Sequence, residues 1–255
     1  MSMYWFVPVC FEYSVSRVVL EKSGIGSLDR IELDQGGSLE QLVNEDISHL
    51  AVVSPGNAKW IEESGARVCM LESRADGNES FLIALGRGGS WRFSSSGDLE
   101  IFLMSGTLLS GKTLFSKGSY LLIPQGATPF VLNAVDDEVL FFVKKRIPEG
   151  LVRKPGLIET EKANWVPGLV SGLSVMPLFS SGGENTALVR WDPGTVFQPH
   201  RHFGGEEVLV VSGVFEDEHG RYPEGSWYRS PHLSRHNPFS VAGCTIFVKT
   251  GHMSQ

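Results

Sequence analysis

Cysteine is scarce in this chain of 255 residues. Its three cysteines, Cys10, Cys69 and Cys244, are too few and too far apart for a disulfide framework or a cysteine-based metal cluster. We therefore expect each cysteine to be a small buried apolar residue. Long apolar runs are also missing, which argues against a membrane-spanning helix. The apolar start, Tyr4–Phe11, is short and has no basic stretch before it, so we predict no signal peptide and a cytoplasmic location.

Positive charge is in short supply as well. The chain has 22 Lys and Arg against 29 Asp and Glu, a formal net charge of −7, and no basic run that could neutralise phosphates. This excludes nucleic acid as an expected partner. The acidic run Glu216–Glu218 is predicted to be a solvated turn. By contrast, 29 glycines and 13 prolines suit a turn-rich β protein, and the length allows one large or two ordinary domains.

Three of the seven histidines stand at regular spacing with one glutamate in the last quarter of the chain. The order is Gly194-x5-His200-x-His202-x3-Glu206-x6-Gly213, followed by Gly225-x5-Pro231-x4-His236. Three imidazoles and one carboxylate form a donor set that suits Fe, Mn, Zn, Ni or Cu. The spacing therefore predicts one divalent transition metal ion, of undetermined identity, held by His200, His202, Glu206 and His236.

Strand geometry explains why this spacing suits a metal site. His200 and His202 are two residues apart, so on a strand both point to the same face. Gly204 and Gly205 can turn the chain, which brings Glu206 back beside the histidines at the root of the next strand. An isolated His-x-His pair is more often a surface pair, but the flanking glycines, Glu206 and His236 favour the metal site.

At these residues the chain resembles the cupin superfamily, small jelly-roll barrels, and within it the ChrR-type cupins. The resemblance rests on the stretches His200–Glu207, Glu216–Gly220, Tyr222–Gly225 and Gly243–Lys249. It implies His200, His202, Glu206 and His236 as the metal ligands. Leu233 departs from the pattern, which has glycine there, and should change the turn more than the ligands.

The chain also repeats itself. Gly106, Gly118 and Pro124 lie 107 residues before Gly213, Gly225 and Pro231, and similar offsets relate Trp60 to Trp165. A period of one whole domain indicates an internal duplication, so we predict an all-β protein of two tandem cupin barrels.

The first copy lacks the ligands of the second. At the same offset, the four predicted ligands fall on Phe93, Ser95, Leu99 and Pro129, none of which binds metal. The first barrel is therefore predicted to be a degenerate, structural partner that packs against the second. The alternative is a metal-free binding pocket lined by Phe93 and its neighbours.

The predicted organisation has four parts. Residues 1–55 form an N-terminal extension of the first barrel, in which Ser38 and Gln41 resemble a capping box that opens a helix to about Leu50. A simple extended entry to the barrel is the alternative. The degenerate barrel spans 56–150, a polar linker 151–164 and the metal-binding barrel 165–255. Strands are predicted near 67–72, 80–85, 100–104, 120–123, 138–144, 173–178, 186–191, 195–202, 206–211, 225–229 and 244–250.

Alternation along the strands predicts which side chains face the metal. Gln198 with Val196, and Val208 with Val210, should line a mostly apolar pocket that suits a small organic molecule. Glu207 should face away from Glu206. Tyr228, Arg229 and His232 lie near the second motif and are substrate contacts or, more simply, a strand aromatic, a surface charge and a loop imidazole.

Two classes of function follow from the resemblance. The first is a metal-dependent enzyme, with dioxygenases that act on diketones or hydroxylated aromatic ketones among the relatives it implies; no catalytic residue is assigned. The second is a sensor of a small ligand or an oxidative signal. The His-x3-Cys-x2-Cys zinc motif of ChrR-type anti-sigma factors is absent, since no two cysteines are neighbours. The expected partner is a small molecule, and a homodimer is possible.

Overall fold

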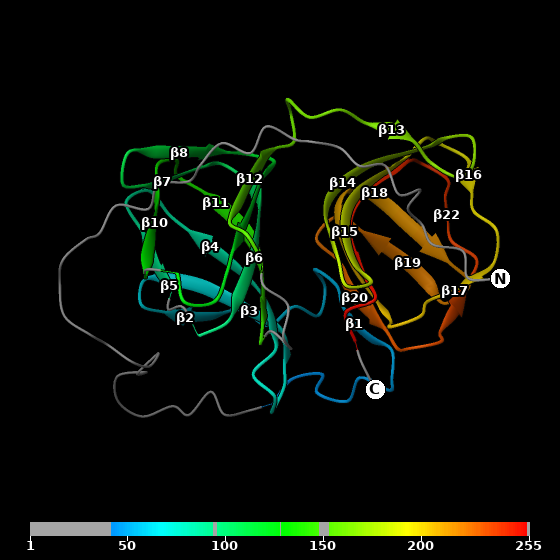
Figure 1. Ribbon diagram of the computed structural model, residues 1–255, viewed down its shortest axis with the longest axis horizontal. Coiled ribbons are helices and arrows are strands. Elements are labelled where there is room, and N and C mark those ends of the chain that lie inside the picture. The colour runs from blue at the N-terminus through cyan, green and yellow to red at the C-terminus, as the bar shows by residue number, and fades with distance from the viewer. Residues whose placement is uncertain (1–41, 94–95, 128, 148–152, 254–255) are drawn as a thin grey trace. The chain divides into compact units, whose positions relative to one another are not determined.

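The computed structural model describes residues 42–93, 96–127, 129–147 and 153–253. These residues form 23 β-strands and contain no helix, so the predicted all-β class is confirmed. They separate into two compact units (Figure 1). We call the described residues of 42–45 and 59–162 the first barrel, and those of 46–58 and 163–253 the second barrel.

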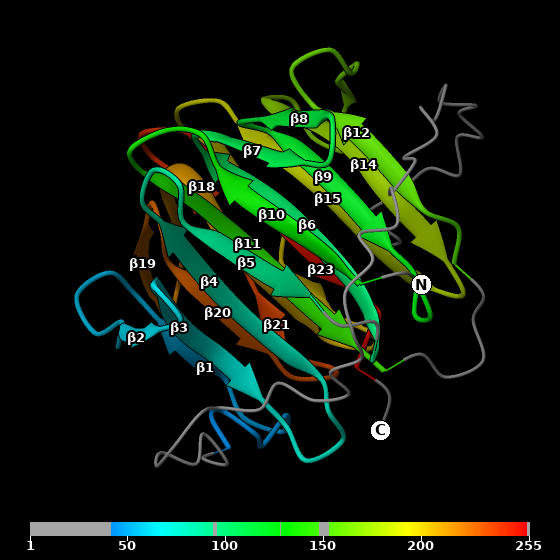
Figure 2. The same ribbon diagram turned by 90° about the vertical axis from the view of Figure 1, so that its left-hand side faces the viewer.

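The first barrel consists of two sheets. The larger has the order β12-β9-β6-β11-β4-β3-β2, and the smaller has the order β5-β10-β7-β8. Figure 2 shows β3, β4, β11 and β6 as neighbours in the larger sheet. The strands are β2 (Ile61–Glu63), β3 (Ala66–Ser73), β4 (Glu79–Leu85), β5 (Ser90–Phe93), β6 (Asp98–Ser105), β7 (Thr107–Ser110), β8 (Thr113–Ser116), β9 (Ser119–Ile123), β10 (Phe130–Ala134), β11 (Val139–Arg146) and β12 (Gly156–Glu159).

The second barrel follows the same plan. Its main sheet has the order β1-β20-β18-β23-β15-β14-β13, with β16, β19 and β22 attached, and β17 and β21 form a separate pair. The strands are β1 (Ala51–Val53), β13 (Val166–Pro167), β14 (Leu173–Ser181), β15 (Glu184–Trp191), β16 (Thr195–Val196), β17 (His200–Arg201), β18 (Glu206–Asp217), β19 (Gly220–Pro223), β20 (Trp227–Ser230), β21 (Arg235–His236), β22 (Phe239–Ser240) and β23 (Cys244–Thr250).

Both barrels bend their long central strand at a motif glycine. Gly106 separates β6 from β7, and Gly213 lies within β18, with φ of 76° and 75°. A Cβ on Gly106 would lie 2.8 Å from the Glu138 carbonyl oxygen, so only glycine fits. A register shift precedes the bend in each barrel, where Met104 and Val211, 107 residues apart, have no Cα partner on β11 and β23. The shared bend and bulge agree with the duplication expected from the sequence.

Apolar side chains fill the inside of each barrel. In the first barrel Ile83, Leu103 and Phe141 are fully buried, and in the second Trp191, Val208 and Phe215 belong to the buried cluster. Burying such side chains supplies about 1.5–3 kcal/mol each, which is the main stabilising contribution to a barrel of this size. Cys69 and Cys244 are buried in the structure, as expected; Cys10 lies outside the described residues.

Most predicted strands are confirmed, but the ends of the barrels differ from the prediction. β1 pairs with β20, Ala51 opposite Arg229, so residues 46–58 belong to the second barrel and do not extend the first. The predicted linker contains β12, which pairs with β9. Both are short edge strands whose partners are distant in sequence. Residues 42–50 form an isolated bridge and turns, so the helix predicted up to Leu50 is wrong there; residues 1–41 are outside the described part.

Candidate metal centre

Two short strands and one long one bring the four predicted ligands together. β17 pairs with β21 so that His200 lies opposite His236. His202 follows β17, and Gly204 and Gly205, with φ of 74° and 69°, turn the chain into β18, which begins with Glu206. These left-handed conformations are ones that glycine adopts at little cost. The sequence order His-x-His, Gly-Gly, Glu therefore folds into one constellation.

The donor atoms of these four residues converge on one point. Nε2 of His236 lies 2.9 Å from Nε2 of His202 and 3.3 Å from Nε2 of His200. Oε2 of Glu206 is 3.5 Å from His202 Nε2 and 3.7 Å from His236 Nε2. All four ligand atoms lie within 4.8 Å of one another.

These spacings fit the ligand shell of a transition metal ion. Nitrogen and oxygen ligands bind such ions at about 2.0–2.2 Å, so neighbouring ligand atoms lie about 3–3.5 Å apart around a shared ion. The observed separations cluster at those values. Three of the four side chains are buried, where convergent nitrogen lone pairs and a carboxylate are costly without a shared cation or proton. The four residues can therefore hold a metal ion.

Hydrogen bonds orient the imidazoles for this task. Nδ1 of His200 lies 3.0 Å from the Gln198 carbonyl oxygen, and Nδ1 of His236 lies 3.2 Å from Oδ2 of Asp217. A carbonyl or carboxylate oxygen can only accept, so each Nδ1 carries a proton and each Nε2 keeps its lone pair toward the cluster in the neutral ring. Tyr228 donates its hydroxyl to Glu206 Oε2 at 3.1 Å, which holds the carboxylate in place.

The electrostatics of the cluster separate the histidines into two kinds. Burial, with the nearby His236, lowers the pKa of His200 to about 4 and the pKa of His202 to about 2, so both rings are neutral at pH 7. Burial also disfavours charge on His236, but the Asp217 hydrogen bond and Glu206 outweigh it and raise its pKa. Burial raises the pKa of Glu206. His236 is thus the ring on which protons compete most with a metal.

Asp217 is the site residue that the sequence prediction missed. Glu216 and Asp217 are 4% and 8% exposed, so the predicted solvated turn is wrong for both and holds only for Glu218. Besides His236, Asp217 Oδ1 accepts the Tyr222 hydroxyl at 3.2 Å and the His219 and Gly220 amides. The available signal was the alternation of β18. Asp217 is eleven residues after Glu206, so in a regular strand the two side chains would point to opposite faces, but the bend at Gly213 changes which face points inward.

We expect Asp217→Asn to change the pH dependence of metal binding. Metal binding requires neutral His236, so affinity falls about tenfold per pH unit below the pKa of this ring. An amide no longer favours the imidazolium, so the pKa of His236 falls and the bend in the affinity curve moves to lower pH. The affinity at high pH should drop about 10–100-fold because the ring is less well oriented. Titrations of metal binding between pH 5 and 8 measure both effects.

The control is Glu224→Gln, which removes an exposed carboxylate of the same barrel. It should leave the position of the bend unchanged. An upward shift in the Asp217→Asn protein would contradict the role assigned to this carboxylate.

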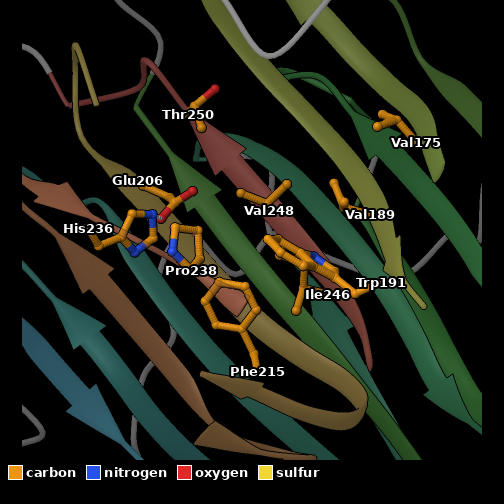
Figure 3. Close-up of a pocket in the computed structure, with 10 residues that line it drawn as sticks. All are labelled: Val175, Val189, Trp191, Glu206, Phe215, His236, Pro238, Ile246, Val248 and Thr250. Atoms are coloured by element: carbon orange, nitrogen blue, oxygen red, sulfur yellow. Dashed lines mark ion pairs between the residues drawn. The ribbon is translucent and has the colours of Figure 1, made fainter. Parts of the chain in front are cut away.

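A small cavity adjoins the cluster inside the barrel (Figure 3). Glu206 and His236 border it on one side, and Trp191 and Val189 lie further along it. Its volume is about 10 Å³, room for roughly one water-sized molecule. The indole N–H of Trp191, a residue only 2% exposed, has no hydrogen-bond partner in the described part of the chain. The cavity is therefore mostly apolar with one unused donor.

The structure places the predicted pocket residues in different environments. Gln198 and Val196 are exposed, so the prediction that they face the cavity is wrong; β16 ends at Val196, and Phe197 points inward instead. Val208 and Val210 are fully buried in the core but do not line this cavity. Tyr228 contacts Glu206, as described above.

The remaining residues near the second motif have structural roles. Arg229 is buried, not a surface charge, and donates to the Asp46 carbonyl oxygen at 2.8 Å. The His232 ring accepts a hydrogen bond from the Gly204 amide. Leu233 adopts the left-handed conformation, φ 64°, that the glycine of the pattern would adopt, and its amide still donates to the His202 carbonyl oxygen. Glu207 accepts from the Trp227 indole and lies outside the cluster.

The first barrel has apolar residues at the positions of the ligands. Phe93 pairs with Phe130 in the register in which His200 pairs with His236, and the two rings stack with centroids 5.1 Å apart. Phe130, not Pro129, is therefore the counterpart of His236. Leu99 faces Ile123 as Glu206 faces Ser230, which confirms Leu99 as the counterpart of Glu206. Ser95 lies outside the described residues.

Comparison with known families identifies the second barrel. Residues 153–254 match the family described as the ChrR cupin-like domain. The second barrel is a ChrR cupin-like domain. No curated protein matches the chain significantly by sequence.

Solved structures show that the cupin fold extends over both barrels. A candidate dioxygenase from Nostoc punctiforme is similar with a TM-score of 0.66 at 13% identity, over 79% of this chain and 82% of that one. A cupin 2 conserved barrel protein from Leptotrichia buccalis gives 0.59 at 12%, over 82% and 99%. Oxalate decarboxylase from Bacillus subtilis gives 0.61 at 12%, over 82% and 77%. At such identities the likeness shows the fold alone, and it confirms the predicted cupin class.

In the described part of the chain, no helix has the length and hydropathy that crossing a membrane requires.

Proposed function

We propose that the second barrel binds one divalent transition metal ion through His200, His202, Glu206 and His236 and acts as a dioxygenase-like enzyme on a small oxygenated organic molecule. The observation that carries the proposal is the convergence of three Nε2 atoms and one carboxylate oxygen within 4.8 Å beside an apolar cavity. The ChrR cupin-like family and the structural likeness to a candidate dioxygenase and to oxalate decarboxylase support it. The cytoplasmic location belongs to the same proposal.

Some residues of the site bind or orient the metal ligands, and others leave room for a substrate to approach. His200 and His202 are neutral at pH 7 and need no proton release before they bind. Asp217 orients His236, and Tyr228 holds Glu206. His200 is the one ligand of the four that is partly exposed, so an organic substrate can approach from its side, while the cavity beside Glu206 and His236 has room for about one water-sized molecule. A bound metal supplies Lewis acidity and, as Fe(II), affinity for dioxygen.

Trp191 is expected to donate its free N–H to a small ligand in the cavity. In Trp191→Phe the apolar wall is kept, but this hydrogen bond is lost. The affinity of the metal-loaded protein for fluoride, a monatomic anion that accepts hydrogen bonds, should fall about 3–10-fold with unchanged metal content. Spectroscopic fluoride titrations measure the change. Trp165→Phe, which lies outside the cavity lining, is the matched control, and equal affinity in wild type and Trp191→Phe would contradict this role.

An oxygen electrode tests the proposed reaction. Iron-loaded protein is mixed with a panel of diketones and hydroxylated aromatic ketones, and the metal-free protein and His200→Ala are run in parallel. We expect substrate-dependent oxygen uptake by the iron-loaded wild type alone. Absence of uptake by protein with its iron verified by metal analysis would overturn the dioxygenase proposal.

A sensor is the second candidate function. The observation that favours it is the small volume of the cavity, about 10 Å³, which admits a small oxidant or gas but no organic molecule without movement of side chains. In a sensor, binding of such a molecule would change the metal spectrum without turnover. The same electrode experiment separates the two, because only the enzyme consumes oxygen continuously.

A further inference from the structure

We propose that the first barrel is a binding site for a small, uncharged, hydrocarbon-rich molecule. A cavity of about 270 Å³ lies in this barrel, against about 10 Å³ beside the metal centre of the second. Phe115, Leu121, Ile123, Phe130 and Leu132 line it, all at most 6% exposed, and the exposed Gln125 stands at its rim. The cavity opens to the surface at this rim, so a small molecule can enter it from solvent.

The cavity corresponds in position to the metal centre. Leu121 faces Ile101 as Tyr228 faces Val208, so Leu121 stands where the second barrel has the tyrosine that holds Glu206. Phe130 stands where the second barrel has His236. Ser110, which faces Thr113 as Asp217 faces Gly220, keeps a small polar group in the lining, and the described counterparts of His200, Glu206, Tyr228 and His236 are all apolar. The duplicated fold thus keeps the place of a site but changes its chemistry.

The lining determines the class of ligand. Among the residues that the structure describes, no charged side chain lines the cavity. An ion would lose its hydration there without a partner, so charged ligands are excluded. An apolar cavity of about 150 Å³ stays dry and binds benzene, so one of 270 Å³ accommodates a molecule of two fused rings or a comparable branched chain. One polar atom of the ligand can reach the Gln125 amide at the rim.

Indole is a suitable probe, since it is uncharged, bicyclic and carries one N–H. We expect isothermal titration to show one site per chain with a dissociation constant of about 0.1–1 mM. Ala127 lines the cavity and is only partly buried, so Ala127→Trp should fill the space and weaken indole binding at least tenfold. Ala75→Trp, an exposed position in the turn between β3 and β4, is the matched control and should bind as wild type.

Indole binding to the first barrel should not depend on the metal. Indole binding should be the same in His236→Ala and in chelator-treated protein, because the cavity belongs to the other barrel. Diffraction from crystals soaked with 5-bromoindole provides a second measurement that does not depend on a variant's folding, with bromine density expected between Leu121 and Phe130. Absence of binding up to several millimolar, or density placed elsewhere, would overturn the proposal.

Discussion

His236→Ala is expected to empty the metal centre. The ring supplies the Nε2 atom that lies closest to the other donors, 2.9 Å from His202 and 3.3 Å from His200. Loss of an outer partner of a ligand typically weakens metal binding 10–100-fold, so loss of the ligand itself should cost at least about 100-fold. Under conditions where wild type retains one metal ion per chain, the variant should retain less than about a tenth. Elemental analysis after gel filtration measures this.

The control for this variant is His219→Ala. The His219 side chain is 51% exposed and lies outside the four-residue cluster, so its removal should leave metal content unchanged. A metal stoichiometry in His236→Ala equal to that of wild type would show that the cluster is not the binding site.

Removal of the metal should lower the thermal stability of the second barrel. A metal present at 100 times its dissociation constant stabilises the folded state by about 2.7 kcal/mol. In a domain of about 100 residues that corresponds to a shift in Tm of about 10–20 °C. Without metal, the buried donors share only a proton. This proton lies on His236, whose charged form is favoured by Asp217 and Glu206. Scanning calorimetry with and without chelator measures the shift.

The first barrel provides an internal reference in this experiment. Its ligand positions carry Phe93, Leu99 and Phe130, so a transition that reports on this barrel should not respond to chelator. His236→Ala should melt like chelated wild type and show no further change with chelator. Coincident melting curves of chelated and metal-loaded wild type would contradict binding of a metal ion that stabilises the folded second barrel.

The sequence predicted the ligand cluster because it is local. His200, His202 and Glu206 lie within seven residues, and strand alternation with a glycine turn determines their relative directions. His236 came from the second motif, and the structure pairs it with His200 across two strands. The strands of both barrels were likewise visible from apolar runs such as Leu121–Ile123, all three of which are buried.

The errors arose where local alternation fails. The prediction that Gln198 faces the cavity assumed a regular strand from 195 to 202, but Pro199 interrupts it and β16 ends at Val196. Asp217 was read as part of a solvated turn because three consecutive acids do not reveal which one points inward beyond the Gly213 bend. β1 and β12 were missed as barrel strands because a three- or four-residue edge strand carries no signal for its distant partner.

The most direct test of the metal centre is X-ray diffraction at the absorption edge of the metal, from crystals of protein loaded with iron, zinc or manganese. The account predicts one anomalous peak per chain, about 2.0–2.2 Å from Nε2 of His200, His202 and His236 and from a carboxylate oxygen of Glu206. A crystal that shows no peak after loading, or a peak bound to other residues, would contradict it.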